Sequence, residues 1–243
     1  MVHSMNKNII CTTYFSSKRD PQSPRCVNNN SYEYIKPWYE SINKLNLNGI
    51  IFHDNLEESF INEYSNNNVS FIYYKPEKYS LNDARFYAYK NYLDSNNIDN
   101  IFMTDVCDVH IKKDPFKFID ENKIYVGSDE PSTPTFGSNS YLLSMARKAV
   151  VAGLQISKSM LEYPCCNAGV IGGHISIIKP FLDNMCATFD FLNSEGNNNM
   201  TVLHYVLDKY HRPIEDKLVT GFPLTSAFKK YDFNNTDVYF VHK

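Results

Sequence analysis

Two carboxylates, Asp105 and Asp108, directly follow a short apolar run at residues 101–103. The run lacks helical spacing, so we expect a buried strand. Side chains of a strand alternate between its faces, and residues three apart can face one site only if the chain turns between them. Such a turn is expected at the carboxyl edge of an open α/β sheet, where ligands bind. Two hard oxygen ligands there favour Mg²⁺ or Mn²⁺ beside substrate phosphates.

An acidic pair of this spacing also has an ordinary structural interpretation, in which Asp105 caps a turn and Asp108 is a solvated loop residue. The surrounding residues favour the chemical interpretation. The sequence Thr-Asp-Val-Cys-Asp-Val at residues 104–109 resembles the metal-binding Asp-x-Asp signature of GT-A-fold glycosyltransferases. It is most similar to the variant in the glycosyltransferase domains of collagen-modifying enzymes.

The resemblance implies a GT-A-type glycosyltransferase that takes a sugar from a nucleotide-sugar, above all a UDP-sugar, with Mn²⁺ or Mg²⁺ as its metal cofactor. The acceptor would be a hydroxyl group of a glycan, a protein, a lipid or a small molecule. Asp105 and Asp108 would be catalytic residues that ligate the metal. The residues beside them would contact the donor: Thr104, Val106 and Cys107.

Arg85 lies in a predicted helix just before the acidic strand. A guanidinium there could bind phosphate or sugar hydroxyl groups with its fork of N–H donors. The order Asn82-Asp83-Ala84-Arg85-Phe86 resembles the segment before the acidic motif in related transferases, where a basic residue faces the donor. Arg85 is therefore both a catalytic and a donor-binding candidate. The alternative is a surface arginine, free in solvent or paired with Asp83.

Thr12, Thr13 and Tyr14 end the first predicted strand. In GT-A enzymes the loop at this position holds the nucleoside, so the resemblance implies that these three residues contact it. The alternative is an ordinary strand end with Tyr14 in the core.

A glycine-containing segment, Asn-Ala-Gly-Val-Ile-Gly-Gly, occupies residues 167–173. Glycines let a backbone approach a ligand closely, and the alternative is a strand that bends at its glycines. The segment lacks the residues of a Walker motif and the spacing of a dinucleotide fingerprint. It resembles the segment of these transferases that borders the sugar and the acceptor. This resemblance makes four residues donor-binding candidates: Asn167, Gly169, Gly172 and Gly173.

His242 ends an apolar run near the last residue of the sequence. A lone histidine is most often structural or solvated. Metal-dependent GT-A enzymes often place a histidine near the end of the domain as a third ligand, so the resemblance implies that His242 joins Asp105 and Asp108 on the metal. Lys243 would then neutralise the leaving diphosphate.

The residue that would accept a proton from the acceptor is less clearly marked. The family often carries an acid at the start of its last long helix, where this chain has Asn199. An amide cannot act as a base, and Asp129 and Glu130 are alternative carboxylates for an inverting transfer. A retaining transfer would need less help from a base. Both stereochemical courses stay open.

The composition of the 243 residues is that of an ordinary globular domain, with 43% hydrophobic and 21% charged residues. A net charge of −3 argues against a protein that binds nucleic acid through bulk positive charge. No apolar run is long enough to span a bilayer, and the first ten residues lack the apolar core of a signal peptide. The six cysteines lack zinc-type spacing. Because no export signal is found, we expect a cytoplasmic protein with reduced thiols.

Strand and helix patterns alternate along the chain, which predicts one α/β domain with a mainly parallel central sheet flanked by helices. The domain is GT-A-like, or Rossmann-like, and covers residues 1–243, with 1–7 disordered or foreign to the natural chain. Strands are predicted at 9–15, 49–54, 69–74, 101–103, 124–127, 166–173 and 237–241. Helices are predicted at 34–45, 57–64, 80–93, 141–160, 175–192 and 199–210.

Two other functions fit part of the pattern. A sugar-phosphate nucleotidyltransferase shares this kind of sheet and also uses a divalent metal, but it normally has a glycine-rich loop after the first strand. Residues 12–20 contain no glycine. A non-catalytic domain that binds nucleotide-sugars is the other alternative, which Asn199 favours.

Overall fold

The computed structural model describes residues 7–18, 29–129, 133–210, 214–226 and 237–242. The candidates Glu130 and Lys243, together with residues 1–6, lie outside these ranges. Within the described ranges, no helix is both long enough and apolar enough to cross a membrane.

The first half of the chain forms a parallel sheet. Its strands are β1 (Asn8–Tyr14), β2 (Gly49–His53), β3 (Val69–Tyr73) and β4 (Asn100–Thr104), in the order β3-β2-β1-β4. The helices α1 (Tyr32–Leu45), α2 (Glu58–Tyr64) and α3 (Leu81–Ser95) connect them. All three strand pairs are parallel, as the alternation of strands and helices predicts.

The second half extends this sheet to seven strands, with β7 (Cys166–His174), β6 (Ile124–Ser128) and β8 (Leu218–Thr220) following β4 in that order. β7 is antiparallel to both of its neighbours, whereas β8 is parallel to β6. The sheet is therefore mixed but mainly parallel, which confirms the predicted fold class. A separate two-stranded sheet pairs β5 (Val109–Ile111) with β9 (Phe240–His242).

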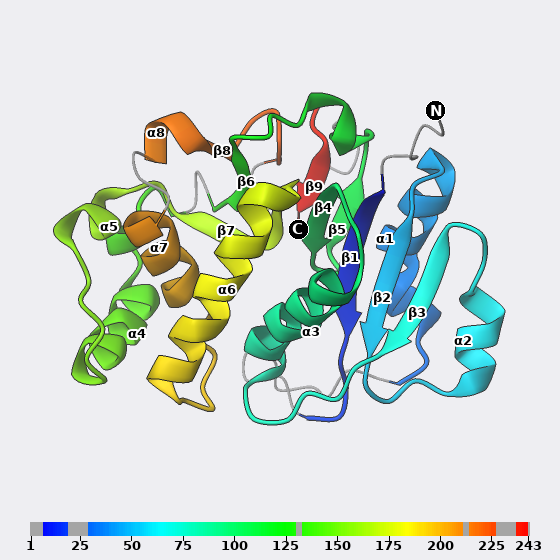
Figure 1. Cartoon of the computed structure of the whole chain (residues 1–243), viewed down its shortest axis with the longest axis horizontal. Coiled ribbons are helices and arrows are strands. Elements are labelled where there is room, and N and C mark those ends of the chain that lie inside the picture. The colour runs from blue at the N-terminus through cyan, green and yellow to red at the C-terminus, as the bar shows by residue number, and fades with distance from the viewer. Residues whose placement is uncertain (1–6, 19–28, 130–132, 211–213, 227–236, 243) are drawn as a thin grey trace.

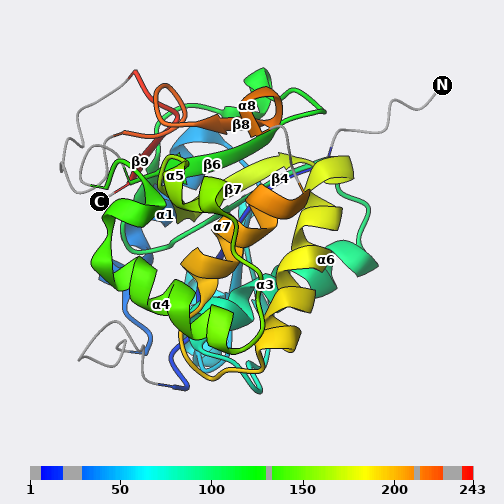
Figure 2. The same cartoon turned by 90° about the vertical axis from the view of Figure 1, so that its left-hand side faces the viewer.

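The remaining helices follow in chain order. They are α4 (Ser140–Val151), α5 (Lys158–Glu162), α6 (Ile175–Leu192), α7 (Asn199–Tyr210) and α8 (Ile214–Lys217), with short 3-10 turns η1 (Pro115–Phe118) and η2 (Phe136–Ser138). One core cluster unites side chains of α3, α4, α6 and α7, and the other unites those of α1, α2 and the β5–β9 sheet. The large sheet thus carries a layer on each face (Figure 1; Figure 2).

Polar side chains buried between these layers fix the end of β4. The indole N–H of Trp38 on α1 donates to Thr104 Oγ1 at 2.9 Å. The hydroxyl of Thr12 donates to the Thr104 carbonyl at 2.8 Å. Buried polar groups that are hydrogen-bonded hold a unique arrangement, so the residue before the acidic pair is held from two sides.

Two predicted elements are wrong in detail. The helix predicted at 141–160 is two helices, because α4 ends at Val151 and Gly153 takes a φ of +100°, which side chains rarely permit. Ser157 then caps α5, with its hydroxyl accepting from Met160 N at 3.1 Å. The strand predicted at 237–241 is β9, Phe240–His242, and it joins the small sheet. The short strands β5 and β8 and the helix α8 were not predicted.

Gly172 marks a very close contact inside the large sheet. A Cβ atom at this position would lie 2.6 Å from the Ile101 carbonyl and would collide with the ring of Phe102. Gly196 offers a matched control, because a Cβ there would approach only Ser194 Oγ, at 3.4 Å.

We expect Gly172→Ala to lower the free energy of unfolding by about 1–3 kcal/mol, since an overpacked core must shift its backbone or rings. Gly196→Ala should change it by less than about 0.5 kcal/mol. Urea denaturation of both variants measures the difference. Equal stability of the two variants would contradict this account of β4–β7 packing.

Candidate active site

The β5–β9 pairing brings distant parts of the chain together at the carboxyl end of β4. After Thr104 the chain turns through Asp105 and Asp108 and then enters β5. In the small sheet, Val109 pairs with His242. His242 therefore lies beside the residue that follows Asp108, and a strand register fixes their separation.

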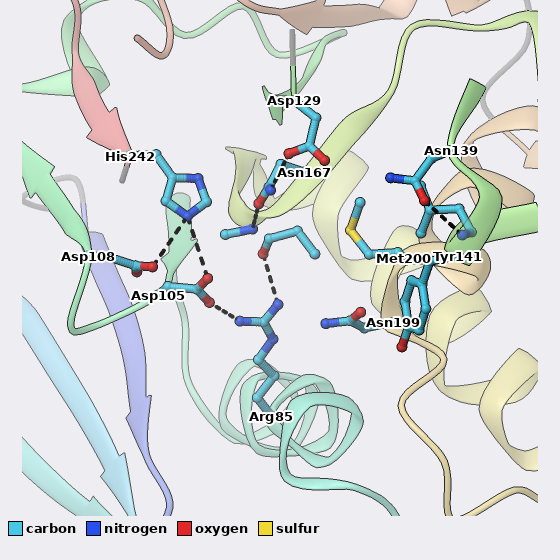
Figure 3. A pocket seen from close by; sticks show the side chains of 13 residues that line it. Arg85, Asp105, Asp108, Asp129, Asn139, Tyr141, Asn167, Asn199, Met200 and His242 are labelled. Carbon is cyan, nitrogen blue, oxygen red and sulfur yellow. Dashed lines mark hydrogen bonds and ion pairs between the residues drawn. The ribbon is translucent and has the colours of Figure 1, made fainter. Parts of the chain in front are cut away.

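Asp105, Asp108 and His242 converge. One ligand atom of each residue lies within 4.8 Å of the other two. His242 Nε2 is 3.7 Å from Asp105 Oδ2 and 4.0 Å from Asp108 Oδ2 (Figure 3). Asp108 Oδ1 is buried without a hydrogen-bond partner in the described part of the chain. Two carboxylates, one of them with an unsatisfied oxygen, and an imidazole fit a divalent cation.

Gly169 leaves the space in which these three side chains meet. A Cβ atom on Gly169 would lie 2.6 Å from His242 Nε2 and 2.8 Å from Asp105 Oδ2. The Gly169 carbonyl also accepts from the Asp105 amide at 2.9 Å. A residue without a side chain is therefore required on β7 directly opposite the acidic pair.

Arg85 on α3 is buried and joins β7 to the turn that follows β4. Its Nη1 forms an ion pair with Asp105 Oδ1, and its Nη2 donates to the Ala168 carbonyl at 3.0 Å. Burial opposes ionisation of Asp105, but Arg85 and His242 outweigh it and hold the pKa of this carboxyl below its usual value. Arg85 thus keeps one carboxylate charged and oriented.

The other two converging groups have pKa values shifted towards their neutral forms. Burial, and then the negative charge of Asp105, raise the pKa of Asp108 to about 7. Burial lowers the pKa of His242, so its imidazole is neutral near pH 7 and can ligate a metal. A bound cation would favour the ionised form of Asp108.

Asn167 links the site to Asp129. Its Nδ2 donates to Asp129 Oδ1 at 2.5 Å, and its Oδ1 accepts from the Gly169 amide at 2.7 Å. Asp129 and Asn167 are each 9% exposed. The predicted carboxylate Asp129 therefore lies at the site and holds the side chain that orients β7 beside Asp105.

α3 also fixes the start of α7, which carries Asn199. The buried carboxylate of Asp83 accepts from the Asn198 amide, with Oδ1 at 3.2 Å and Oδ2 at 3.0 Å. Burial raises the pKa of Asp83 to about 7. Because Arg85 lies two residues further along α3, one helix holds both Asp105 and the turn before Asn199.

Two cavities meet at the acidic pair, and both include Arg85, Asp105, Asp108 and Asn199. The first cavity, of about 310 Å³, is also lined by Asp129, Asn139, Tyr141, Leu142, Asn167, Ala168, Gly169, Met200 and His242 (Figure 3). The second, of about 200 Å³, is also lined by Thr13, Tyr34, Asn82, Val106 and Cys107. The acidic pair thus lines both pockets.

The remaining candidates from the sequence line neither cavity. The side chain of Thr12 is fully buried, and the hydroxyl of Tyr14, also fully buried, accepts from the Ser31 amide at 3.0 Å. Gly172 packs against Phe102, and Gly173 packs against the Lys123 carbonyl. Thr12 bonds the Thr104 carbonyl at the end of β4, whereas Gly172 and Gly173 pair with Phe102 and Ile101 further back along that strand.

Several residues that line the cavities were not predicted from the sequence. In the second cavity the missed aromatic is Tyr34, whose ring lies 4.7 Å from that of Tyr14. In the first cavity the residues not predicted include Asn139, Tyr141 and Met200. Asn139 caps α4, with its Oδ1 accepting from Leu142 N at 3.1 Å. A polar cap at a helix start was the available signal, but it indicates a helix rather than a pocket.

Comparison with known proteins gives a match in structure. The chain resembles the crystal structure of the galactosyltransferase LgtC in complex with donor and acceptor sugar analogs, with a TM-score of 0.57 and 11% sequence identity. The match covers 96% of this chain and 86% of that one. This chain has the LgtC-like GT-A fold.

A structure of an active-site mutant of LgtC matches with a TM-score of 0.56 and 14% identity, over the same shares of the two chains. No family model and no curated protein matches the sequence. At these identities the likeness establishes the fold alone. The side chains of the site must therefore carry the functional argument.

We expect Gly169→Ala to weaken Mn²⁺ binding by at least about tenfold, because the added methyl group occupies the space between His242 and Asp105. Calorimetric titration measures the affinity, and circular dichroism verifies the fold. Gly196→Ala is again the control. Unchanged affinity in a folded Gly169→Ala variant would show that the three side chains do not share a cation.

His204 attaches α7 to β7. Its Nε2 accepts from the Cys166 amide at 3.0 Å, and its Nδ1 bonds the Met200 carbonyl at 2.8 Å. Burial lowers the pKa of His204 from 6.5 to about 4. The unfolded chain therefore takes up this proton first, and the stability that neutral His204 contributes is lost as the pH falls from 6.5 towards 4.

We expect His204→Gln to have a lower free energy of unfolding than the parent at pH 7. This difference in free energy should shrink by up to a few kcal/mol as the pH approaches 4. Urea denaturation at a series of pH values measures both proteins. The raised pKa of Asp83 acts equally in both and cancels from the difference. A difference that does not vary with pH would rule out a neutral buried imidazole.

Proposed function

We propose that this protein is a metal-dependent glycosyltransferase that moves a sugar from a nucleotide-sugar, in particular a UDP-sugar, to a hydroxyl acceptor. The observation that carries the proposal is the convergence of Asp105, Asp108 and His242 at the carboxyl end of β4. This is the edge at which α/β sheets bind ligands. The LgtC-like fold supports the same reaction class.

Asp105, Asp108 and His242 would hold Mn²⁺ or Mg²⁺, whose preferred ligands are oxygen and imidazole nitrogen. Such a cation stabilises the negative charge that grows on a leaving diphosphate without supplying a proton. The chain provides the ionised Asp105, oriented by Arg85, and the neutral imidazole of His242. Two of the five N–H donors of Arg85 bond to Asp105 and Ala168, and Arg85 lines both cavities, so further donors can meet the phosphates.

The second cavity supports binding of the nucleoside. Tyr34 offers an aromatic wall there, with Thr13, Asn82 and Cys107 around it. Bases stack on aromatic side chains, and hydroxyl and amide groups can bond to their edges. We assign this cavity to the nucleoside of the donor, next to the carboxylates that would hold the diphosphate through the cation.

The first cavity would take the transferred sugar and the acceptor. The LgtC structure contains donor and acceptor sugar analogs, which is consistent with two substrates beside one acidic pair. Among the groups lining the first cavity, Asn199 cannot accept a proton, whereas Asp129 is a carboxylate. In an inverting transfer we assign the base role to Asp129.

Replacing Asp108 by asparagine tests this function. We expect Asp108→Asn to lower Mn²⁺-dependent hydrolysis or transfer of UDP-sugars by about a hundredfold or more, because the site loses one of its two carboxylate ligands. Release of UDP measures turnover. Asp94→Asn, which changes a surface carboxylate bound to Lys90 and Lys179, is the control.

Three outcomes would contradict the assignment. Turnover equal to that of the parent would remove the metal site from the reaction. Pyrophosphate release from a nucleoside triphosphate and a sugar phosphate would indicate a nucleotidyltransferase. UDP binding without turnover on any acceptor would indicate a binding domain.

A thermal-shift screen of nucleotides and nucleotide-sugars, with and without Mn²⁺, identifies the donor, since a ligand that binds the folded state raises the melting temperature of the protein.

A further inference from the structure

A third cavity, of about 330 Å³, lies between α6, α7 and the segment 153–155. Its residues do not line the two cavities at Asp105. Asn199 starts α7 in the active site, and Lys209, ten residues later, lines this third cavity. The separation along the helix is about 15 Å. We call this cavity the α6–α7 groove; Figure 2 faces the helices around it.

Two aromatic side chains of the groove are unusually open to solvent. Phe191 is 57% exposed and Tyr210 is 44% exposed. Gly153, which has no side chain, lies beside Phe191, and a Cβ atom there would be 3.4 Å from the ring. Large aromatic side chains gathered at one exposed hollow mark a binding surface more often than chance.

Lys209 places a positive charge beside the rings of Tyr205 and Tyr210. Its Nζ donates to the Tyr205 hydroxyl at 2.8 Å and lies 5.2 Å from the ring centroids of both Tyr205 and Tyr210. The tyrosine hydroxyls raise its pKa. No carboxylate of the described residues pairs with Lys209, and an ammonium has three N–H donors. Donors therefore remain for an anion.

We propose that the α6–α7 groove is a second binding site, separate from the candidate active site, for saccharides that carry a carboxylate or a phosphate. The apolar face of a sugar ring would lie against Phe191 and Tyr210. Its anionic group would meet Lys209, and its hydroxyls would bond to Gln155 and Tyr205, which also line the groove.

Other ligands fit these residues less well. A lipid chain would displace water from Lys209 and Gln155 without forming hydrogen bonds to them, and burying polar groups in this way costs free energy. A nucleic acid would need several cations along its phosphates, whereas the residues that line this groove include one, Lys209. The proposal does not depend on the transfer reaction at Asp105.

The test is a titration of the full chain followed by ¹H–¹⁵N NMR. The probes are methyl glucuronide, glucose 6-phosphate, methyl glucoside and inorganic phosphate. We expect the two anionic sugars to shift the amides of residues 153–155, 188–191 and 205–210 with dissociation constants on the order of millimolar. The neutral glucoside should bind about tenfold more weakly.

Variants separate the two contributions. Phe191→Ala and Tyr210→Ala should each lower the affinity for every sugar by about tenfold. Lys209→Met should lower only the affinity for the anionic sugars, to that of the neutral glucoside. Tyr73→Ala is the control, because Tyr73 is 63% exposed on β3, away from the groove. Asp108→Asn should leave these affinities unchanged, so failure at the active site is distinguishable from failure here.

Several results would overturn the proposal. Binding of inorganic phosphate as tightly as the sugar phosphate would indicate a simple anion site. Sugar affinities that do not respond to Phe191→Ala would place the sugars elsewhere. If no sugar shifts the amides of the groove, the groove is not a saccharide site. If the protein instead binds anionic vesicles or self-associates, and Phe191→Ala abolishes that behaviour, the groove is a surface for membranes or for a second copy of the chain.

Discussion

The pairing of β5 with β9 is the constraint on which the candidate site depends. It joins a strand that leaves the acidic turn to the strand that carries His242, with Val109 opposite His242. A one-residue slip would turn the imidazole to the other face of its strand. The buried Phe240 resists such a slip, because its ring packs against Phe102 of β4, with centroids 5.0 Å apart. Core packing and the position of His242 beside the acidic pair are thus set by the same register.

Electrostatics explains why these charges need one another. Two carboxylates half-buried beside each other repel, and their burial also disfavours ionisation. Arg85 offsets this for Asp105 through a direct ion pair. Among the described residues no lysine or arginine forms an ion pair with Asp108, which lies beside the His242 imidazole, and the pKa of Asp108 rises to about 7. The described residues therefore compensate the charge of Asp105 but not that of Asp108, and a divalent cation would compensate the second charge.

The sequence identified the centre of the site better than its walls. Asp105 and Asp108 stand out because a short motif carries them, whereas His242 was expected only from the family resemblance. The structure brings all three together. Tyr14 and Tyr34 show the opposite case. The resemblance implied that Tyr14 contacts the nucleoside, and no sequence feature singled out Tyr34, yet Tyr34 and not Tyr14 lines the second cavity. Which of two stacked aromatics faces a ligand depends on tertiary packing, and local spacing does not contain that information. The helix break at Gly153 was hidden for the same reason, since one glycine is often tolerated within a helix.

The contact between Trp38 and Thr104 gives the molecule a built-in optical reporter. Trp38 is the chain's single tryptophan, so its fluorescence arises from one defined place. The indole is fully buried, and its N–H bonds the hydroxyl of the residue that precedes Asp105. A ligand that shifts the end of β4 changes the surroundings of the indole and therefore its emission. Occupancy of the acidic turn can thus be followed by light in the unlabelled protein.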